Sequence, residues 1–84
     1  MTKNLRMREK KLWLVISFET TTAAMAVEAL CKQEGIGGRI IPLPKEISAG
    51  CGLSWRAEVT ERPKLEALLR REQITPGGIY EIVL

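Results

Sequence analysis

The chain has 84 residues, of which 45% are hydrophobic and 27% are charged, and its net charge is +3. A chain of this length and composition forms one soluble globular domain with a thin core. Its longest apolar run, LWLVISF, is much too short for a membrane span, and the charged start MTKNLRMREKK has no cleavage site of a secretory signal. These features predict a cytoplasmic protein without a membrane partner.

The positive charge is concentrated at the start of the chain. Residues 1–11 carry five lysines and arginines against one glutamate, whereas residues 12–84 carry eight basic and nine acidic residues. We therefore expect a basic, disordered tail over residues 1–10 and a near-neutral single domain over residues 11–84. This distribution disfavours nucleic acid as the partner of the folded part.

Two cysteines and the absence of histidine restrict the chemistry. Cys31 and Cys51 are not part of a C-x-x-C motif, and a reducing cytosol would keep both as thiols. Without histidine there is no Cys–His or Ser–His–Asp catalysis and no ordinary zinc site. We expect no metal and no cofactor, and independent enzymatic catalysis is the function with the least support.

The first half of the chain predicts a strand, a helix and a second strand. Residues 11–19 are apolar on both faces, which is typical of a central strand. Residues 20–38 form a helix that starts at the threonines and stops at the glycine cluster. Its buried stripe is predicted to be Ala23, Val27, Leu30, Cys31 and Glu34, so Cys31 is expected to be a small buried hydrophobe. Residues 39–44 form a strand in which Pro42 requires an edge position.

The second half predicts a connection, a strand, a helix and a final strand. Residues 45–52 connect two strands, with room for one helical turn. Residues 53–59 alternate in polarity. The face toward the core is predicted to carry Leu53, Trp55, Ala57 and Val59, and the open face Ser54, Arg56 and Glu58. Residues 62–73 form a helix with Pro63 in its first turn, and residues 79–84 form the last strand.

The element order β-α-β-β-α-β predicts an α+β fold of the ferredoxin-like class. In this fold a four-stranded antiparallel sheet, with strand order 4-1-3-2, carries both helices on one face. The apolar first strand and the proline of the second strand agree with that order, because the first strand is central and the second is at an edge.

This topology brings Cys51 to the rim of the sheet where the first helix begins. The end of the first strand, Thr20 and Thr21 at the helix start, and the connection that holds Cys51 share that rim. A helix N-terminus presents unpaired N–H groups and a partial positive charge, which favour a thiolate. Gly50 and Gly52 flank the sulfur without side chains, so they permit a tight turn and close approach of a partner.

Other side chains bear on this cysteine in the sequence. Ser48 either hydrogen-bonds the sulfur or caps the helical turn of the connection. Arg39, Lys45 and Arg56 would add positive field, although Arg56 also fits a solvated strand position. From the residues alone, two interpretations of Cys51 stay open: a half-buried residue at the start of a strand, and a reactive thiol.

The stretch RIIPLPKEISAGCGLSWR resembles the signature IPxPxxISxxCGLxxR of the putative selenium/sulfur carrier protein-like family, a small bacterial domain. The resemblance covers about residues 12–82. The matching residues are Ile41, Pro42, Pro44, Glu46, Ile47, Ser48, Cys51, Gly52, Leu53 and Arg56, with Ile79 and Tyr80 near the end.

The resemblance implies a sulfur or selenium carrier rather than an independent enzyme. Cys51 would hold a persulfide or selenosulfide, receive it from a cysteine desulfurase-type donor and relay it to an acceptor enzyme. The residues expected to support Cys51 are Gly50, Gly52, Ser48, Thr20, Thr21 and Arg56.

Two other functions stay open at this point. A regulatory or oligomerisation module would form a homodimer through its open sheet face, where Trp13 and Val15 are predicted to lie. An RNA-binding module has the same element order but needs exposed aromatic side chains on the central strands. The third strand offers only Ser54, Arg56 and Glu58 there, which disfavours RNA.

Overall fold

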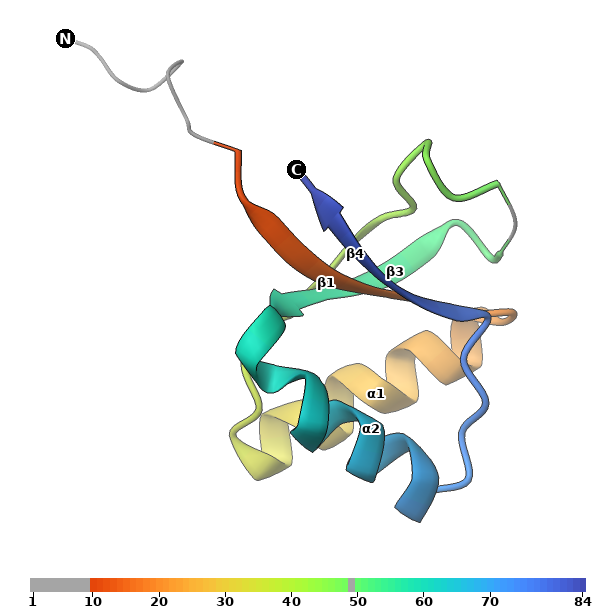
Figure 1. Ribbon diagram of the computed structural model, residues 1–84. Helices are drawn as coiled ribbons and strands as arrows, with labels where there is room; N and C mark the ends of the chain where they lie inside the picture. Colours follow the sequence, from red (N-terminus) through yellow and green to blue (C-terminus); the bar gives the residue numbers. More distant parts are fainter. Residues whose placement is uncertain (1–9, 49) are drawn as a thin grey trace, which may run out of the picture.

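The computed structural model describes residues 10–48 and 50–84. Within this part, four antiparallel strands form one sheet in the order β2-β3-β1-β4, which is 4-1-3-2 when it is read from the β4 edge. Both helices lie on one face of the sheet (Figure 1). The elements in chain order are β1 (Leu12–Ser17), α1 (Thr21–Glu34), β2 (Arg39–Pro42), β3 (Leu53–Glu58), the 3₁₀ helix η2 (Val59–Glu61), α2 (Arg62–Arg71) and β4 (Gly78–Val83). The predicted α+β class is confirmed.

The first helix begins at the predicted threonines and ends before Gly35, the first of the glycines predicted to stop it, so it is shorter than the predicted range of residues 20–38. The Ala23 backbone N–H donates a hydrogen bond of 3.1 Å to the Thr20 hydroxyl, which caps the helix. At the other end Gly35 takes the left-handed conformation, with φ of 70°, in which glycine has no steric penalty. The helix buries Ala24, Val27 and Cys31. Ala24 therefore takes the place in the stripe that was predicted for Ala23, which is only half-buried.

The sheet positions of the strands follow from their composition. β1 is central and pairs with both β3 and β4, while β2 lies at the edge, where Pro42 removes no ladder hydrogen bond. The buried core between sheet and helices comprises Leu14, Ile16, Phe18, Ala24, Val27, Cys31, Ile36, Trp55, Ala57, Leu65, Leu68 and Leu69. Several boundaries differ from the prediction: β2 ends at Pro42 rather than at Pro44, Val59 belongs to η2 rather than to β3, and α2 ends at Arg71 rather than at Gln73.

The face of the sheet away from the helices is less open than the alternation predicts. Val15 and Ser54 are fully buried on this face, although the sequence placed both on an open surface. The β2–β3 link (residues 43–52) lies on this side of the sheet (Figure 1), and its Ile47 is buried outside the helix-side core. The prediction of an open face is therefore wrong at Val15 and Ser54, because a long connection packs back onto the sheet.

The link, in which the sequence left room for one helical turn, contains a β-turn instead. The Ile47 N–H donates to the Pro44 carbonyl at 2.9 Å, which closes a four-residue β-turn. Of the tail expected over residues 1–10, only Lys10 lies within the described part, and it is exposed. Among the described helices, none combines the length and the hydrophobicity that crossing a bilayer requires.

Candidate functional site

Cys51 is held in place by backbone hydrogen bonds at the end of the sheet. The Leu43 N–H donates to the Gly52 carbonyl at 2.9 Å, which closes the base of the link, and the Cys51 N–H donates to the Phe18 carbonyl at 2.9 Å. Phe18 directly follows β1 and stands two residues before Thr20. The predicted meeting of the link with the end of β1 and the start of α1 is therefore observed.

The two glycines beside Cys51 have conformations that other residues rarely adopt. Gly50 has a φ of 142° and Gly52 a φ of 94°, and positive values of this size favour glycine strongly. A Cβ atom on Gly50 would also stand 3.1 Å from the Phe18 carbonyl oxygen. The pair of glycines is thus required for the turn that presents Cys51, whatever chemistry the thiol performs.

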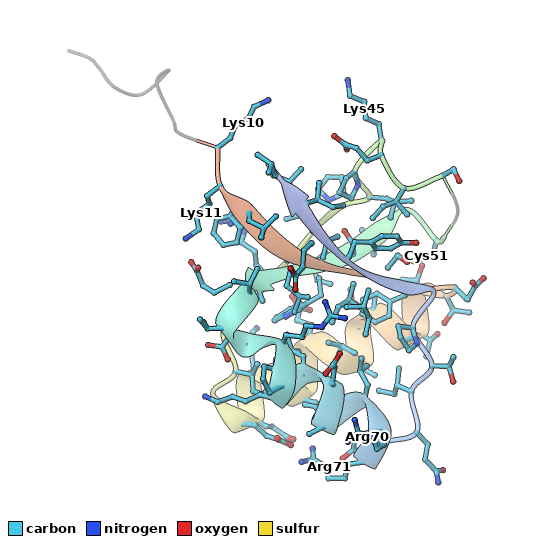
Figure 2. All side chains as sticks on the ribbon, viewed as in Figure 1. Lys10, Lys11, Lys45, Cys51, Arg70 and Arg71 are labelled. Carbon is cyan, nitrogen blue, oxygen red and sulfur yellow. The ribbon has the colours of Figure 1, made fainter. Side chains whose placement is uncertain are left out.

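The thiol itself lies at the boundary between core and surface. Cys51 is half-buried and packs against the helix-side core. Its sulfur lies 3.8 Å from the Leu53 carbonyl oxygen, to which the S–H donates a weak hydrogen bond. Figure 2 shows Cys51 at the end of the sheet where the link joins β3. The Cys51 side chain is consequently partly covered by the core and partly exposed.

The threonines at the start of α1 share this end of the molecule. The Thr20 hydroxyl accepts the N-cap hydrogen bond. Thr21 is the first helical residue and is exposed. Both were expected to support Cys51, and that support stays a prediction. The effect of the helix N-terminus on the thiol stays a prediction.

Four other residues were associated with Cys51 in the sequence, and three of them, Arg56, Lys45 and Arg39, lie or point away from it (Figure 2). Ser48 is exposed and directly follows the β-turn of the link, and its function as a partner of the sulfur or as a cap stays a prediction. Arg56 stands five residues farther along the chain, roughly 16 Å in an extended strand, and its guanidinium lies over the Trp13 ring at 4.1 Å. Lys45 points away from Cys51 (Figure 2), and Arg39 pairs in register with Arg56.

Cys31 is the opposite kind of cysteine. It is 1% exposed, and burial, followed by the charges of Glu34 and Glu61, raises the pKa of its thiol from 9.0 to about 11. Both cysteines are free. Over residues 10–48 and 50–84 no three side chains of the kinds that bind metals come together as a candidate site. Of the two free thiols, only Cys51 therefore belongs to a residue that is partly exposed.

The groups that sequence reasoning missed are main-chain atoms. The Phe18 carbonyl anchors the Cys51 backbone, and the Leu53 carbonyl orients its sulfur. Every residue has such a carbonyl, so no residue type marks them. The only sequence signal was indirect: the topology predicted that the end of the first strand and the link share one rim.

Comparison with known proteins supplies one match. The family model described as putative Se/S carrier protein-like matches residues 14–81, which is most of the chain. The chain belongs to this family. The Se/S carrier match includes the whole link, both cysteines and all six elements of regular α and β structure except the ends of β1 and β4. Two further searches, one among curated proteins and one among solved structures, found no match.

Proposed function

We propose that this protein carries sulfur or selenium on Cys51 and passes it to an acceptor protein. The observation that carries the proposal is the pair of contrasting thiols: Cys51 is half-buried on a glycine-flanked turn at the rim, whereas Cys31 is sealed in the core. The description of the family supports the same function. The donor and the acceptor are expected to be separate proteins, with a cysteine desulfurase as the donor class.

The transfer needs only one thiolate on this chain. The Cys51 thiolate attacks the terminal sulfur of a persulfide on the donor, a new S–S bond forms on Cys51, and the donor cysteine leaves as a thiolate with the electron pair of the broken S–S bond. An acceptor nucleophile then attacks the terminal sulfur on Cys51, which leaves as a thiolate. No net oxidation occurs in either step, and selenium in the terminal position follows the same course.

The environment of Cys51 suits a relay better than a redox enzyme. A peroxidase or disulfide oxidoreductase commonly resolves its intermediate with a second thiol. The second thiol of this chain belongs to α1, is buried and is held protonated by a pKa of about 11. A persulfide on Cys51 would therefore persist until an external acceptor removes it.

The experiment is loading by a cysteine desulfurase with cysteine as the sulfur source, followed by mass spectrometry of the intact protein and its peptides. We expect the mass of one added sulfur atom on the peptide that contains Cys51. A parallel reaction with selenocysteine shows whether selenium is carried as well. A reducing agent should release the added atom, because a persulfide is reversible.

The two cysteines provide matched controls. Cys51→Ser should lose the added sulfur, and Cys31→Ala should keep it, since Cys31 is sealed by the core. Loading that survives in Cys51→Ser would assign the cargo to another residue. No loading of the wild-type protein would favour a non-catalytic regulatory or oligomerisation module.

A further inference from the structure

Far from Cys51, two arginines face the same cavity without an acidic partner. Arg39 of β2 and Arg56 of β3 stand directly opposite each other in the strand register. They line a cavity of about 200 Å³ together with Trp13, Gly37, Gly38, Ala57 and Glu58. Like charges at directly opposed positions destabilise a sheet. A bound anion would reduce the repulsion between these two arginines.

The carboxylates beside the cavity do not neutralise the two arginines. Glu58 accepts from the Lys11 ammonium at 2.8 Å. Glu61, whose carboxylate borders the Gly37 side of the cavity, lies 3.9 Å from the Lys64 ammonium. Among the described residues no carboxylate lies within ion-pair distance of Arg39 or Arg56. Two positive charges therefore remain for a ligand.

Arg56 is oriented in advance for such a ligand. Its guanidinium stacks on the Trp13 ring at 4.1 Å, and the Lys11 ammonium lies over the same ring at 4.6 Å. Two cationic side chains therefore contact the same indole ring. The Nε atom of Arg56 is buried without a hydrogen-bond partner among the described residues. A stacked guanidinium loses little conformational freedom when it binds an anion.

The shape of the cavity limits the ligand to a small group. Gly38 has a φ of 140°, and a side chain there would collide with the Trp55 indole, so the wall beside Arg39 stays free of side chains. A volume of about 200 Å³ is below that of ordinary pockets for drug-sized molecules.

From this arrangement we propose that the cavity between Arg39 and Arg56 binds a phosphate-type oxyanion. Arginine forks match the oxygen geometry of phosphate and form charge-assisted hydrogen bonds to it. The phosphate is either a free ion or part of a polyanion backbone. The site is separate from the proposed carrier function, because Figure 2 shows Lys11, which lies over Trp13, and Cys51 toward opposite ends of the sheet.

The test is an NMR titration with inorganic phosphate at low ionic strength. We expect phosphate to shift the backbone amide signals of residues 37–39 and 56. Arg39→Gln should weaken the binding at least about tenfold, since one charge-assisted contact is worth at least that factor. Arg39 is exposed, so this substitution leaves the fold intact. Arg56→Lys keeps the charge but removes the fork and should also weaken the binding.

The control arginine is Arg70, which is exposed on α2 and distant from Lys11 (Figure 2). Arg70→Gln should bind phosphate as the wild type does, and so should Cys51→Ser, because neither residue lines the cavity. An equal loss in Arg39→Gln and Arg70→Gln, or shifts spread over the surface lysines, would overturn the proposal.

A second titration, with a single-stranded octanucleotide, distinguishes the two sources of phosphate. Tighter binding than inorganic phosphate, lost in Arg39→Gln and reduced steeply by salt, would place a polyanion backbone in the cavity. Affinity no higher than that of phosphate would assign a free oxyanion. Octanucleotide binding that Arg39→Gln leaves unchanged would contradict any use of this cavity.

Discussion

Cys31 and Cys51 are both free thiols, but α1 and the β2–β3 link give them different surroundings. Cys31 lies on the buried stripe of a helix, where neighbouring apolar side chains and two glutamates oppose its ionisation. Cys51 lies on a turn that is tied to the sheet through main-chain atoms. The helix gives its cysteine a packing function, and the link leaves its cysteine in contact with solvent.

The comparison shows that residue type does not determine reactivity in this protein. A helix position on the core side excludes both water and partners, whereas a turn with two glycines removes the neighbouring side chains that would cover the sulfur. Access and protonation together decide whether a thiol exchanges. The predictions below separate these two contributions.

The largest expected difference between the two cysteines is in alkylation. At neutral pH, iodoacetamide should modify Cys51 at least about 100-fold faster than Cys31, because a thiol with a pKa of about 11 is almost wholly protonated there and is also buried. Peptide mass spectrometry over a time course measures both rates. In denaturant the two rates should converge, and equal slow rates in the folded protein would contradict the distinction.

The second prediction concerns Cys31 and the dependence of stability on pH. Below about pH 9 the Cys31 thiol is protonated in both the folded and the unfolded chain. The contribution of its burial to the free energy of unfolding is therefore fully present there. As the pH rises from about 9 to about 11, the unfolded thiol ionises while the folded one resists. The free energy of unfolding should therefore fall by about 2–3 kcal/mol from this group.

Denaturant unfolding at about pH 8 and about pH 10.5 measures this loss. Cys31→Ala should show a smaller decrease than the wild type over that interval, whereas Cys51→Ala should retain the decrease that comes from Cys31. An identical decrease in the wild type and Cys31→Ala would show that burial does not perturb this thiol.

The third prediction addresses the turn that presents Cys51. Gly50→Ala should lower the free energy of unfolding by about 2 kcal/mol, because its φ is 142° and the added Cβ would lie 3.1 Å from the Phe18 carbonyl. Gly52→Ala should cost about 1 kcal/mol, since only its φ of 94° opposes alanine. Thermal or chemical unfolding measures both.

Gly37 is the matched control for these two glycines. A Cβ atom there would make only an ordinary contact, 3.7 Å from a Glu61 oxygen, so Gly37→Ala should change stability by less than about 0.5 kcal/mol. If Gly50→Ala were as well tolerated as Gly37→Ala, the turn would not need its glycine.

The last prediction concerns the start of α1, where the expected effect is as small as that of Gly52→Ala. Thr20→Ala removes the hydroxyl that accepts from the Ala23 N–H and should destabilise the protein by about 1 kcal/mol. Thr22→Ala, at an exposed helical position, should change stability by less than about 0.5 kcal/mol. A larger loss at Thr22 than at Thr20 would be incompatible with Thr20 as the cap.

Much of the fold was predictable because local sequence patterns determine where its helices and strands form. The alternation in β3, the cap at Thr20, the stop at Gly35 and the proline in β2 each reflect a conformational preference or a one-sided burial. Such preferences act within a few residues, so they can be recognised in the sequence. They also identified Cys51 as the candidate and Cys31 as a core residue.

The tertiary structure decided how the link packs and which residues meet. The burial of Val15 and Ser54, the bond from Cys51 to the Phe18 carbonyl, and the stacking of Arg56 on Trp13 depend on contacts between distant parts of the chain. A backbone carbonyl has no residue-specific signature, and a 10-residue link can pack in many ways. The sequence by itself therefore determined which elements form and which cysteine is the candidate, and only long-range packing determined what surrounds it.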